Sequence, residues 1–326
     1  MVKIHDVAKK AGVSVSTVSR AFRQDVSINE ETRQQILTIA RESGYAPNLL
    51  ARGLKSSTTK TVGVIGSIDT PFYVDIIKGI ETELLKLGYH MLIGLSVTTP
   101  DIERYYLEYM AGSQVAGIIL MPFADENAAY IKQLYKRNVK IIQVFRYPYD
   151  FLDSVVVDDE QGAYLAASEL LGRGHTRILL ADVPVSFAYQ RSAGYRKAFR
   201  ERGVEPNPDL IVPFKSPDLD LLHALMQKLR PTAVITGVHD HGKMVVRYAQ
   251  KHHLDIPKDL SVIMFDNVEW MEMMRMDAIA QPVDYIGVTA SRLLADRIAD
   301  ADYITQPVSL VLQPRLIKRG SIREIS

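Results

Sequence analysis

Hydrogen-bonding and aromatic side chains follow several apolar segments of this 326-residue chain, at positions where a small molecule can be held. The apolar segments are predicted strands, and parallel sheets bind ligands beyond the carboxyl ends of their strands. Guanidinium groups bind carboxylates or phosphates through paired hydrogen bonds, and hydroxyl and carboxylate oxygens accept hydrogen bonds. The candidate side chains at these predicted strand ends are Thr70, Phe72, Tyr73, Arg146 and Asp266, and Asp158 is a further candidate where the second half of the strand pattern is expected to begin.

His239, Asp240 and His241 form a His-x-His pattern, which also occurs in metal sites. No third ligand follows at a suitable spacing and no acid/base pair accompanies the pattern, so we expect structural or ligand-contacting histidines and no metal. The chain has no cysteine, which excludes disulfides, thiolate nucleophiles and iron–sulfur sites. It also lacks P-loop, GxGxxG, GxSxG and HExxH strings. We therefore expect neither an enzyme nor a bound cofactor.

A short segment near the N-terminus has the side chains needed to contact DNA bases. Ser16, Thr17, Ser19 and Arg20 are small or charged, and an arginine can donate two hydrogen bonds to a guanine edge in the major groove. Residues 1–60 carry ten Lys/Arg and five Asp/Glu, whereas the other residues carry 29 and 33. A basic head on a mildly acidic body indicates that the head meets a polyanion.

Two predicted helices position this segment. Residues 4–11 place apolar side chains at i, i+3, i+4 and i+7, which is typical of one helix face. Gly12 can adopt the left-handed conformation that a tight turn requires. Ser14 is then a candidate N-cap for a second helix over residues 15–22.

A third helix is expected to begin near Asn29, where Ser27 and Glu30 have the spacing of a capping box, and to end at residues 43–44. Helix, glycine turn, helix and a third supporting helix make a helix-turn-helix arrangement. The alternative interpretation is an ordinary three-helix bundle with a solvated face.

From Thr61 onward, strand-like segments alternate with amphipathic helical segments, which indicates doubly wound parallel sheets. Two similar series of strands are expected, at 61–67, 90–96, 116–122 and 140–145, and then at 177–183, 209–214, 232–237 and 261–266. Helices are expected between them, for example at 73–87, 160–173 and 284–299. The fold class is therefore α/β, with a small all-α domain followed by two subdomains and a ligand cleft between the subdomains.

The string from Ile4 to Arg20, IHDVAKKAGVSVSTVSR, resembles the N-terminal signature of the LacI/GalR family of bacterial transcription regulators. Thr32-Arg33 and the segment 44–48 keep the register of that family. The resemblance covers the rest of the chain and implies an effector domain like the type I periplasmic binding proteins. Residues 307–321 resemble the closing strand of that domain, which crosses back between its lobes.

The resemblance implies that the chain is divided into three parts. Residues 1–47 correspond to the helix-turn-helix domain, 48–60 to a hinge helix and linker, and 61–326 to the effector-binding and dimerisation domain. The N-terminal lobe of the last part is expected at about 61–158 plus 284–312, and the C-terminal lobe at about 159–283 plus 313–326.

A homodimer on double-stranded operator DNA is the implied complex. Val15, Ser16, Thr17 and Arg20 correspond to the major-groove residues. The residues that correspond to the hinge helix in the minor groove are Asn48, Ala51, Leu54 and Lys55. Leu54 has the position of a leucine that wedges into the central base step, and inserted apolar wedges kink DNA. Without the resemblance, Leu54 would be expected to pack on the body.

The resemblance adds effector-contacting residues to those at the predicted strand ends. The effector-binding residues that it supplies are Phe187, Arg191, His239, Asp266 and Gln281. His239 stands where the family usually has an acidic residue, so the local charge becomes more positive. Because Arg146 and Arg191 are assigned to the same cleft, we hypothesise an anionic sugar derivative whose ring stacks on Phe72 or Tyr73. The alternative is a neutral sugar that accepts hydrogen bonds from the arginines.

The expected function is a sequence-specific DNA-binding repressor that a small-molecule effector controls, with no enzymatic activity. One alternative is a free-standing sugar-binding protein, which the basic head argues against. Another is a regulator that takes a phosphocarrier protein as corepressor, because residues 292–294 resemble part of the surface used by such relatives. No signal-peptide segment or bilayer-length apolar run is present, so we expect a cytoplasmic protein without a membrane segment.

Overall fold

The computed structural model describes residues 2–22, 28–45, 59–96, 99–122, 125–184, 188–300 and 306–325. The chain divides into two compact units, which we call the head (Met1–Thr59) and the body (Lys60–Ser326). Within the described ranges, no helix is both long enough and apolar enough to cross a membrane.

The described residues of the head form the expected helices α1 (Ile4–Ala11), α2 (Val15–Ala21) and α3 (Glu30–Glu42). Gly12 ends α1 with φ +66°, a left-handed conformation that glycine adopts without the steric cost of a Cβ. The Ser14 hydroxyl accepts the backbone N–H of Thr17 at 3.1 Å and so begins α2. The apolar faces of all three helices meet in one small core of Val7, Ala8, Val18, Ala21, Ile36 and Ala40.

The start of α3 differs from the expected capping box. Asn29 is the N-cap, and its Oδ1 accepts the backbone N–H of Glu31 at 2.9 Å. Ser27, the predicted partner of Glu30, lies outside the described residues. Glu30 instead accepts hydrogen bonds from Arg33 and Gln34 along the same helix.

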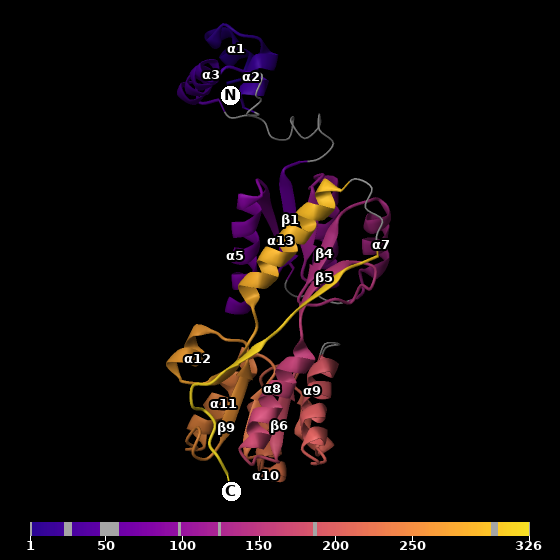
Figure 1. The fold of residues 1–326 in the computed structure, drawn as a ribbon, viewed down its shortest axis with the longest axis vertical. Helices are drawn as coiled ribbons and strands as arrows, with labels where there is room; N and C mark the ends of the chain where they lie inside the picture. The colour runs from indigo at the N-terminus through magenta and orange to yellow at the C-terminus, as the bar shows by residue number, and fades with distance from the viewer. Residues whose placement is uncertain are drawn as a thin grey trace. The chain divides into compact units, whose positions relative to one another are not determined.

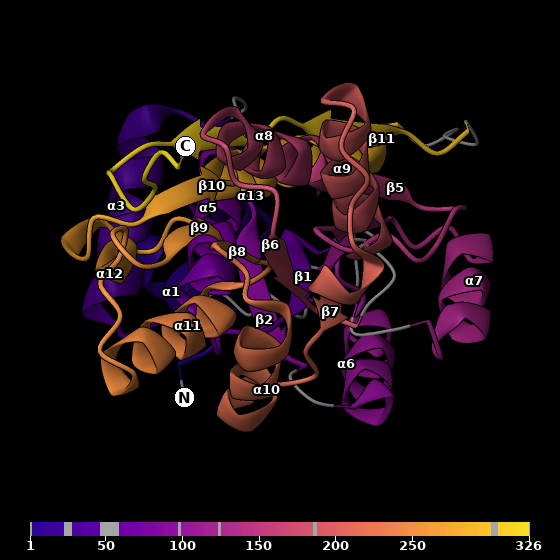
Figure 2. The ribbon, with the colours of Figure 1, turned by 90° about the horizontal axis from the view of Figure 1, so that it is seen from below.

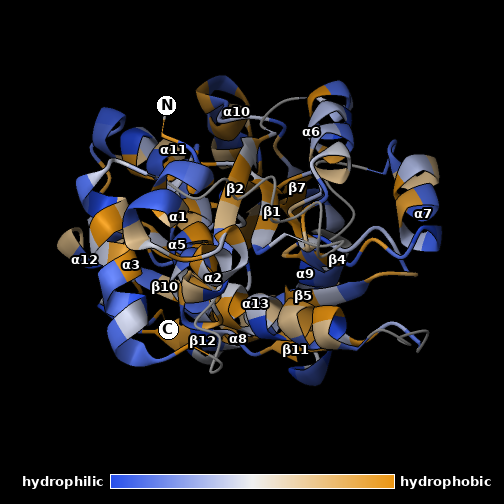
Figure 3. Ribbon diagram, turned by 90° about the horizontal axis from the view of Figure 1, so that it is seen from above, coloured by the Kyte–Doolittle hydropathy of each residue, from blue (hydrophilic) through white to orange (hydrophobic). Residues whose placement is uncertain are grey.

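The first lobe of the body is built on a six-stranded parallel sheet with the order β11-β5-β4-β3-β1-β2. Its strands are β1 (Thr61–Gly66), β2 (His90–Leu95), β3 (Gly117–Leu120), β4 (Ile141–Val144), β5 (Asp153–Val157) and β11 (Ser309–Leu312). Helices α5 (Pro71–Lys86) and α13 (Val283–Ala299) pack on one face, and α6 (Pro100–Gly112) and α7 (Ala128–Lys136) on the other. The strands are coloured as hydrophobic in Figure 3, whereas α6 and α7 carry many hydrophilic residues.

The second lobe repeats this design with the strand order β12-β10-β9-β8-β6-β7, in which only the β10–β12 pair is antiparallel. Its strands are β6 (Ile178–Asp182), β7 (Ile211–Pro213), β8 (Ala233–Thr236), β9 (Ser261–Phe265), β10 (Asp277–Ala280) and β12 (Arg315–Ile317). Its helices are α8 (Asp159–Gly172), α9 (Ala188–Glu201), α10 (Leu219–Leu229), α11 (His239–Lys251) and the short α12 (Glu269–Met273). Figure 2 shows α8 and α9 on one face of this sheet and α10 and α11 on the other.

The chain crosses between the two lobes three times. The crossings run from β5 to α8 at Asp158, from β10 to α13 at Pro282, and from β11 to β12 through residues 313–314. The third crossing is the yellow segment that runs between the lobes in Figure 1. Asp158 connects two crossings, because its carboxylate accepts the backbone N–H of Gln161 at 2.8 Å and the side-chain amide of Gln313 at 3.3 Å.

Two helices of the first lobe approach each other through glycines. A Cβ at Gly79 would lie 2.8 Å from the carbonyl oxygen of Asp284, and a Cβ at Gly287 would overlap the Ile76 carbonyl and lie 2.6 Å from the Ile80 nitrogen. The absence of these methyl groups lets α5 and α13 touch at backbone distance. Because α13 begins at the second crossing, this contact fixes where the crossing enters the first lobe.

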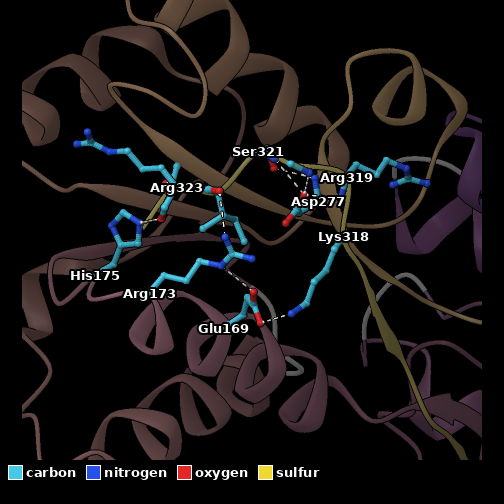
Figure 4. Close-up of polar contacts among 11 residues, drawn as sticks. Glu169, Arg173, His175, Asp277, Lys318, Arg319, Ser321 and Arg323 are labelled. Atoms are coloured by element: carbon cyan, nitrogen blue, oxygen red, sulfur yellow. Dashed lines mark hydrogen bonds and ion pairs between the residues drawn. The ribbon is translucent and has the colours of Figure 1, made fainter. Parts of the chain in front are cut away.

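The C-terminal segment is fastened to the second lobe by a polar cluster (Figure 4). One carboxylate oxygen of Asp277 accepts the backbone N–H groups of Arg319, Gly320 and Ser321 at 2.7, 2.7 and 3.1 Å. The buried His175 ring lies between the Thr232 hydroxyl at 2.9 Å and the Arg323 carbonyl oxygen at 3.1 Å. These bonds hold the end of the chain behind β12 and therefore anchor the third crossing.

Candidate functional site

The predicted base-contacting residues lie on α2, with the side chains arranged as a surface and a core. Ser16 and Arg20 are exposed, whereas Val15 and Thr17 are half-buried. The Ser14 hydroxyl is 2.6 Å from the Ser16 hydroxyl and 2.8 Å from that of Thr17. The N-cap therefore holds both hydroxyls near the start of α2.

Five predicted site residues cannot be placed. The hinge residues Asn48, Ala51, Leu54 and Lys55 and the effector candidate Phe187 lie outside the described residues. The roles that the resemblance implies for them remain predictions.

A small pocket lies at the carboxyl ends of the strands of the first sheet, and we call it the strand-end pocket. It encloses about 100 Å³, and Ser67, Asp69, Tyr73, Ser96, Met121, Pro122, Phe145 and Arg146 line it. The buried Ser96 hydroxyl has no hydrogen-bond partner within the described part of the chain. An unsatisfied buried hydroxyl is costly, so a ligand that bonds to it recovers free energy.

A group of aromatic rings lies at the strand-end pocket. The ring centroid of Phe145 lies 4.8 Å from that of Phe72 and 5.9 Å from that of Tyr73. Phe145 has φ +66°, a conformation that is strained for a residue with a side chain and that occurs often at functional sites. Burial raises the pKa of Tyr73, and the Arg146 guanidinium beside the phenol opposes this rise. Phe72, Tyr73 and Arg146 are thus brought together as predicted.

Thr70 has a structural role in this structure. Its hydroxyl accepts the backbone N–H of Tyr73 at 3.5 Å and caps α5, with Pro71 as the first helical residue. The cap determines where α5 begins and so positions Phe72 and Tyr73 at the strand-end pocket.

A larger pocket lies beside the second and third crossings, and we call it the hinge-side pocket. It encloses about 440 Å³ and is lined from both lobes by Phe72, Asp75, Asp266, Asn267, Val268, Ala280, Gln281, Pro282, Val283, Asp284, Tyr285, Gln313 and Arg315. Its volume lies within the range of small-molecule sites. Sequence reasoning did not identify Asp75, Asp284, Tyr285 or Arg315, because residues on a helix or a crossing carry no strand-end signal.

Asp266 is the centre of the polar wall of the hinge-side pocket. One carboxylate oxygen accepts the backbone N–H of His239 at 3.1 Å and lies 3.2 Å from the His239 Nδ1, and the other accepts the Gln281 amide at 2.8 Å. Asp266 also has φ +71°, which the buried environment must enforce. His239, Asp266 and Gln281 therefore form one hydrogen-bonded group at the ends of β8, β9 and β10.

Arg191, a predicted effector-contacting residue, is buried and paired with side chains of the second lobe. Its side chain is 1% exposed, with Nε 2.8 Å from Asp159 and one terminal nitrogen 3.3 Å from Asp182 and 2.5 Å from the Gly237 carbonyl oxygen. The guanidinium also lies over the Phe265 ring, 4.3 Å from its centroid. Its charge is thus neutralised by two carboxylates of the protein.

Asp159 and Asp182 together carry more negative charge than the single guanidinium of Arg191 can neutralise. Burial raises the pKa of Asp159 and of Asp182, and the nearby Arg191 lowers both in part. One carboxylate oxygen of Asp182 and the buried Thr236 hydroxyl have no hydrogen-bond partner among the described residues. Arg191, Asp159, Asp182 and Thr236 are thus buried polar residues of the second lobe whose hydrogen-bonding capacity is only partly used.

The second histidine of the His-x-His pattern is a buried structural residue. The Nδ1 of His241 lies 3.3 Å from the Ala181 carbonyl oxygen, and its ring packs 5.6 Å from that of Phe214. Burial lowers the pKa of His241, so the ring is neutral near pH 7. No cluster of three or more potential metal ligands occurs in the part of the chain that the structure describes.

Arg292, from the segment resembling a corepressor surface, lies on α13. Its Nε is 2.7 Å from a carboxylate oxygen of Glu83 on α5, and its side chain is largely exposed. The ion pair lowers the pKa of Glu83 and joins the two helices.

Comparisons with known proteins follow the same division of the chain. Residues 3–48 match the family described as bacterial regulatory proteins, lacI family, and residues 167–322 match the periplasmic binding protein-like domain. Catabolite control protein A of Priestia megaterium is 32% identical over 305 residues, which cover 90% of this chain and 91% of that protein. The HTH-type transcriptional repressor PurR of Klebsiella pneumoniae is 30% identical over 99% of this chain and 98% of that protein.

Solved structures share the fold over the whole length. A lac repressor dimer bound to operator and the anti-inducer ONPF has a TM-score of 0.85 at 22% identity, and the alignment covers 99% of each chain. The CelR–cellobiose complex has a TM-score of 0.73 at 25% identity and covers 98% of this chain and all of that chain. A ribose-bound LacI-family regulator from Enterococcus faecium has a TM-score of 0.72 at 26% identity and covers 82% of this chain and all of that chain.

These matches confirm the predicted family, the fold class and the expectation of a regulator rather than an enzyme. Operator DNA, a small-molecule effector and a dimer are typical of the family. The chain belongs to the lacI family of bacterial regulatory proteins and is a DNA-binding transcriptional repressor regulated by a small-molecule effector.

Proposed function

We propose that this repressor is a homodimer whose operator binding is controlled by a neutral sugar bound in the cleft between the two lobes. Val15, Ser16, Thr17 and Arg20 of α2 contact the operator bases in this proposal. A repressor acts where the chromosome lies, so the protein is cytoplasmic.

The charge of the cleft walls carries the proposal for a neutral effector. The anionic hypothesis relied on Arg146, Arg191 and His239, but Arg191 is already paired with two buried carboxylates and His239 contacts Asp266. The two pockets contain four carboxylates, from Asp69, Asp75, Asp266 and Asp284, and two guanidinium groups, from Arg146 and Arg315. A sugar phosphate would meet net repulsion there, whereas sugar hydroxyls can donate to carboxylates and accept from arginines.

Two similar proteins support a neutral sugar as the chemical class of the effector. The CelR complex contains cellobiose and the Enterococcus faecium regulator contains ribose, and both sugars are uncharged. Phe72 and Tyr73 supply the aromatic surface on which an apolar sugar face can stack.

Ligand binding in the cleft can be coupled to operator binding through the crossings that join the two lobes. A ligand held by both lobes changes their closure, and closure changes the distance between the N-terminal lobes of a dimer. That distance determines whether the two hinge segments can pair in the minor groove.

Calorimetry with chemically matched ligands tests the effector class. We expect D-glucose, D-galactose or D-ribose to bind more tightly than the corresponding sugar phosphate and sugar acid. Asp266→Asn should weaken the neutral ligand, because it removes an acceptor from the polar wall. Tighter binding of the phosphate or acid in the wild type would overturn the proposal and restore the anionic hypothesis.

A further inference from the structure

The hinge-side pocket contains a buried acceptor that the protein leaves unused. Gln281 is 6% exposed and lines the pocket, and its Nε2 donates to Asp266 at 2.8 Å. This bond fixes the amide orientation, because a flipped amide would place its oxygen against the carboxylate. The Gln281 Oε1 then has no hydrogen-bond partner among the described residues, and a donor from a ligand would satisfy it.

An exposed aromatic ring stands in the lining of the same pocket. Tyr285, at the start of α13, is 69% exposed, although large aromatic side chains generally bury much of their surface. Phe72, Val268 and Val283 add apolar lining, and Phe72 is itself part of the aromatic group beside the strand-end pocket. An apolar surface with one exposed ring is the arrangement that binds the face of a sugar ring.

Acceptors predominate among the remaining polar groups. The carboxylates of Asp75 and Asp284 and the side chain of Gln313 accompany a single guanidinium, that of Arg315. The Asn267 oxygen already accepts a hydrogen bond from Arg319 at 2.6 Å, which leaves its amide N–H groups as donors. This balance fits a group with several hydroxyls and does not fit a phosphate.

The two pockets differ in size, and rings of one aromatic group line both of them. The strand-end pocket encloses about 100 Å³ and the hinge-side pocket about 440 Å³. Phe72 lines the larger pocket, Phe145 lines the smaller one, and their ring centroids are 4.8 Å apart. A ligand that reaches both pockets must therefore extend past the aromatic rings.

We propose that the effector contains two rings, and that the second, hydroxyl-bearing ring occupies the hinge-side pocket between Tyr285 and Gln281. This inference rests on the proposed function that the cleft binds a neutral sugar. The second ring contacts residues 280–283 and Gln313, which belong to two of the three crossings, so it braces the hinge between the lobes. Affinity and coupling then depend on Tyr285 in a way that a single-ring ligand would not show.

Matched glycosides test the inference on the full-length protein. The pairs are methyl β-D-glucopyranoside with cellobiose, methyl α-D-glucopyranoside with maltose, and methyl β-D-galactopyranoside with lactose. We expect at least one disaccharide to bind at least tenfold more tightly than its methyl glycoside. Tyr285→Ala should reduce that ratio to within twofold without changing the affinity for the methyl glycoside. Tyr109→Ala on α6, another exposed tyrosine, should leave both affinities unchanged.

Other outcomes would overturn either the second-ring inference or the proposed neutral-sugar function. Equal affinities within every pair, or loss of the methyl glycoside together with the disaccharide in Tyr285→Ala, would contradict a second-ring compartment and leave the neutral-sugar function standing. Absence of binding by all six sugars, with binding of a sugar phosphate or sugar acid, would overturn the proposed function and the inference that rests on it.

Discussion

At the scale of single residues, Arg20 is the side chain on α2 with the most specific DNA chemistry. It is exposed, and a guanidinium that bonds to both acceptors of a guanine distinguishes that base from the others. Arg20→Ala should weaken operator binding by about 1–3 kcal/mol and binding to random DNA much less. Fluorescence anisotropy with both DNAs measures the two losses, and Arg41→Ala, on the exposed surface of α3, removes the same charge as a control. Equal losses on both DNAs for Arg20→Ala would remove it from base recognition.

Arg191 illustrates how a residue assigned to an effector site can also have partners within the protein that a sequence does not show. Its position in the cleft-forming segment followed from the family resemblance, but its contacts are Asp159, Asp182 and the Gly237 carbonyl. A linear sequence does not reveal that two carboxylates from α8 and β6 converge on one guanidinium. Burial decides the outcome, because a buried guanidinium requires such partners.

Removing Arg191 should therefore damage the fold as well as any ligand site. Arg191→Met leaves two buried carboxylates without their cation, and breaking a buried ion pair in this way costs about 3–5 kcal/mol. Urea unfolding of the isolated variant measures the loss. Adding Asp159→Asn to the variant should recover part of it, since one uncompensated charge is removed. A loss below about 1 kcal/mol would show that the pairing contributes little to stability.

At the scale of elements, the close contact of α5 and α13 gives a prediction with an internal control. Gly287→Ala places a methyl group against the Ile76 carbonyl and the Ile80 nitrogen, which are backbone atoms with little freedom to move. We expect a loss of about 1–3 kcal/mol in the free energy of unfolding, as for other overpacked sites. At Gly112, the last residue of α6, an added Cβ meets no atom within 4 Å. Gly112→Ala should be neutral or stabilising by up to about 1 kcal/mol, and the reverse order of the two variants would contradict the packing argument.

The fastening of the C-terminal segment predicts a pH dependence of stability. Burial lowers the pKa of His175 below its unfolded value of about 6.5. The unfolded state then binds the proton more readily, so the stability from this group is complete above about pH 6.5 and falls as the pH decreases further. His175→Asn should have lower stability at pH 7.5 and a smaller decrease between pH 7 and pH 5.5 than the wild type. Chemical unfolding at both pH values checks this, and a wild-type slope retained in full by His175→Asn would assign the dependence to other groups.

Elements with a clear period or cap were predictable, and short elements without one were not. The head helices followed from Gly12, Ser14 and the apolar stripe of residues 4–11, and eight strands followed from apolar runs. β5 (Asp153–Val157) and β10 (Asp277–Ala280) were missed, because each begins with a polar residue and contains only three apolar residues in a row. Their pairing with β4 and β9 depends on the folded sheet, which a local pattern does not contain.

Only part of the candidate site was predicted, because some of its residues are brought together by the tertiary fold and carry no local sequence pattern. Phe72, Tyr73, Arg146, Asp266 and Gln281 line pockets of the cleft, as strand ends and family register implied. Thr70 and Asp158 cap helices in the structure, which is a second common use of polar residues at such positions, and their contact with an effector stays a prediction. Tyr285 and Arg315 come from a helix start and a crossing strand, and only the tertiary fold brings them to the same pocket.

At the scale of the whole molecule, regulation depends on linkage between the cleft and the DNA-binding head. The hinge-side pocket contacts two of the three crossings, so its occupant favours one closure of the lobes over another. By reciprocity, a ligand that alters operator affinity must bind the free and operator-bound repressor with affinities that differ by the same factor. A ligand that binds both forms equally shifts nothing, however tightly it binds.

The most direct test is therefore the operator affinity of the dimer with and without the sugar that calorimetry identifies. The operator can be selected from a random DNA pool by the purified protein, and anisotropy then gives the Kd at fixed salt, because salt alone changes protein–DNA affinity strongly. We predict at least a tenfold change in the operator Kd on adding the sugar to the wild type, and no change for Asp266→Asn, which disrupts the polar wall of the cleft. An operator Kd that is the same at zero and saturating sugar would contradict the central claim that this cleft regulates the repressor.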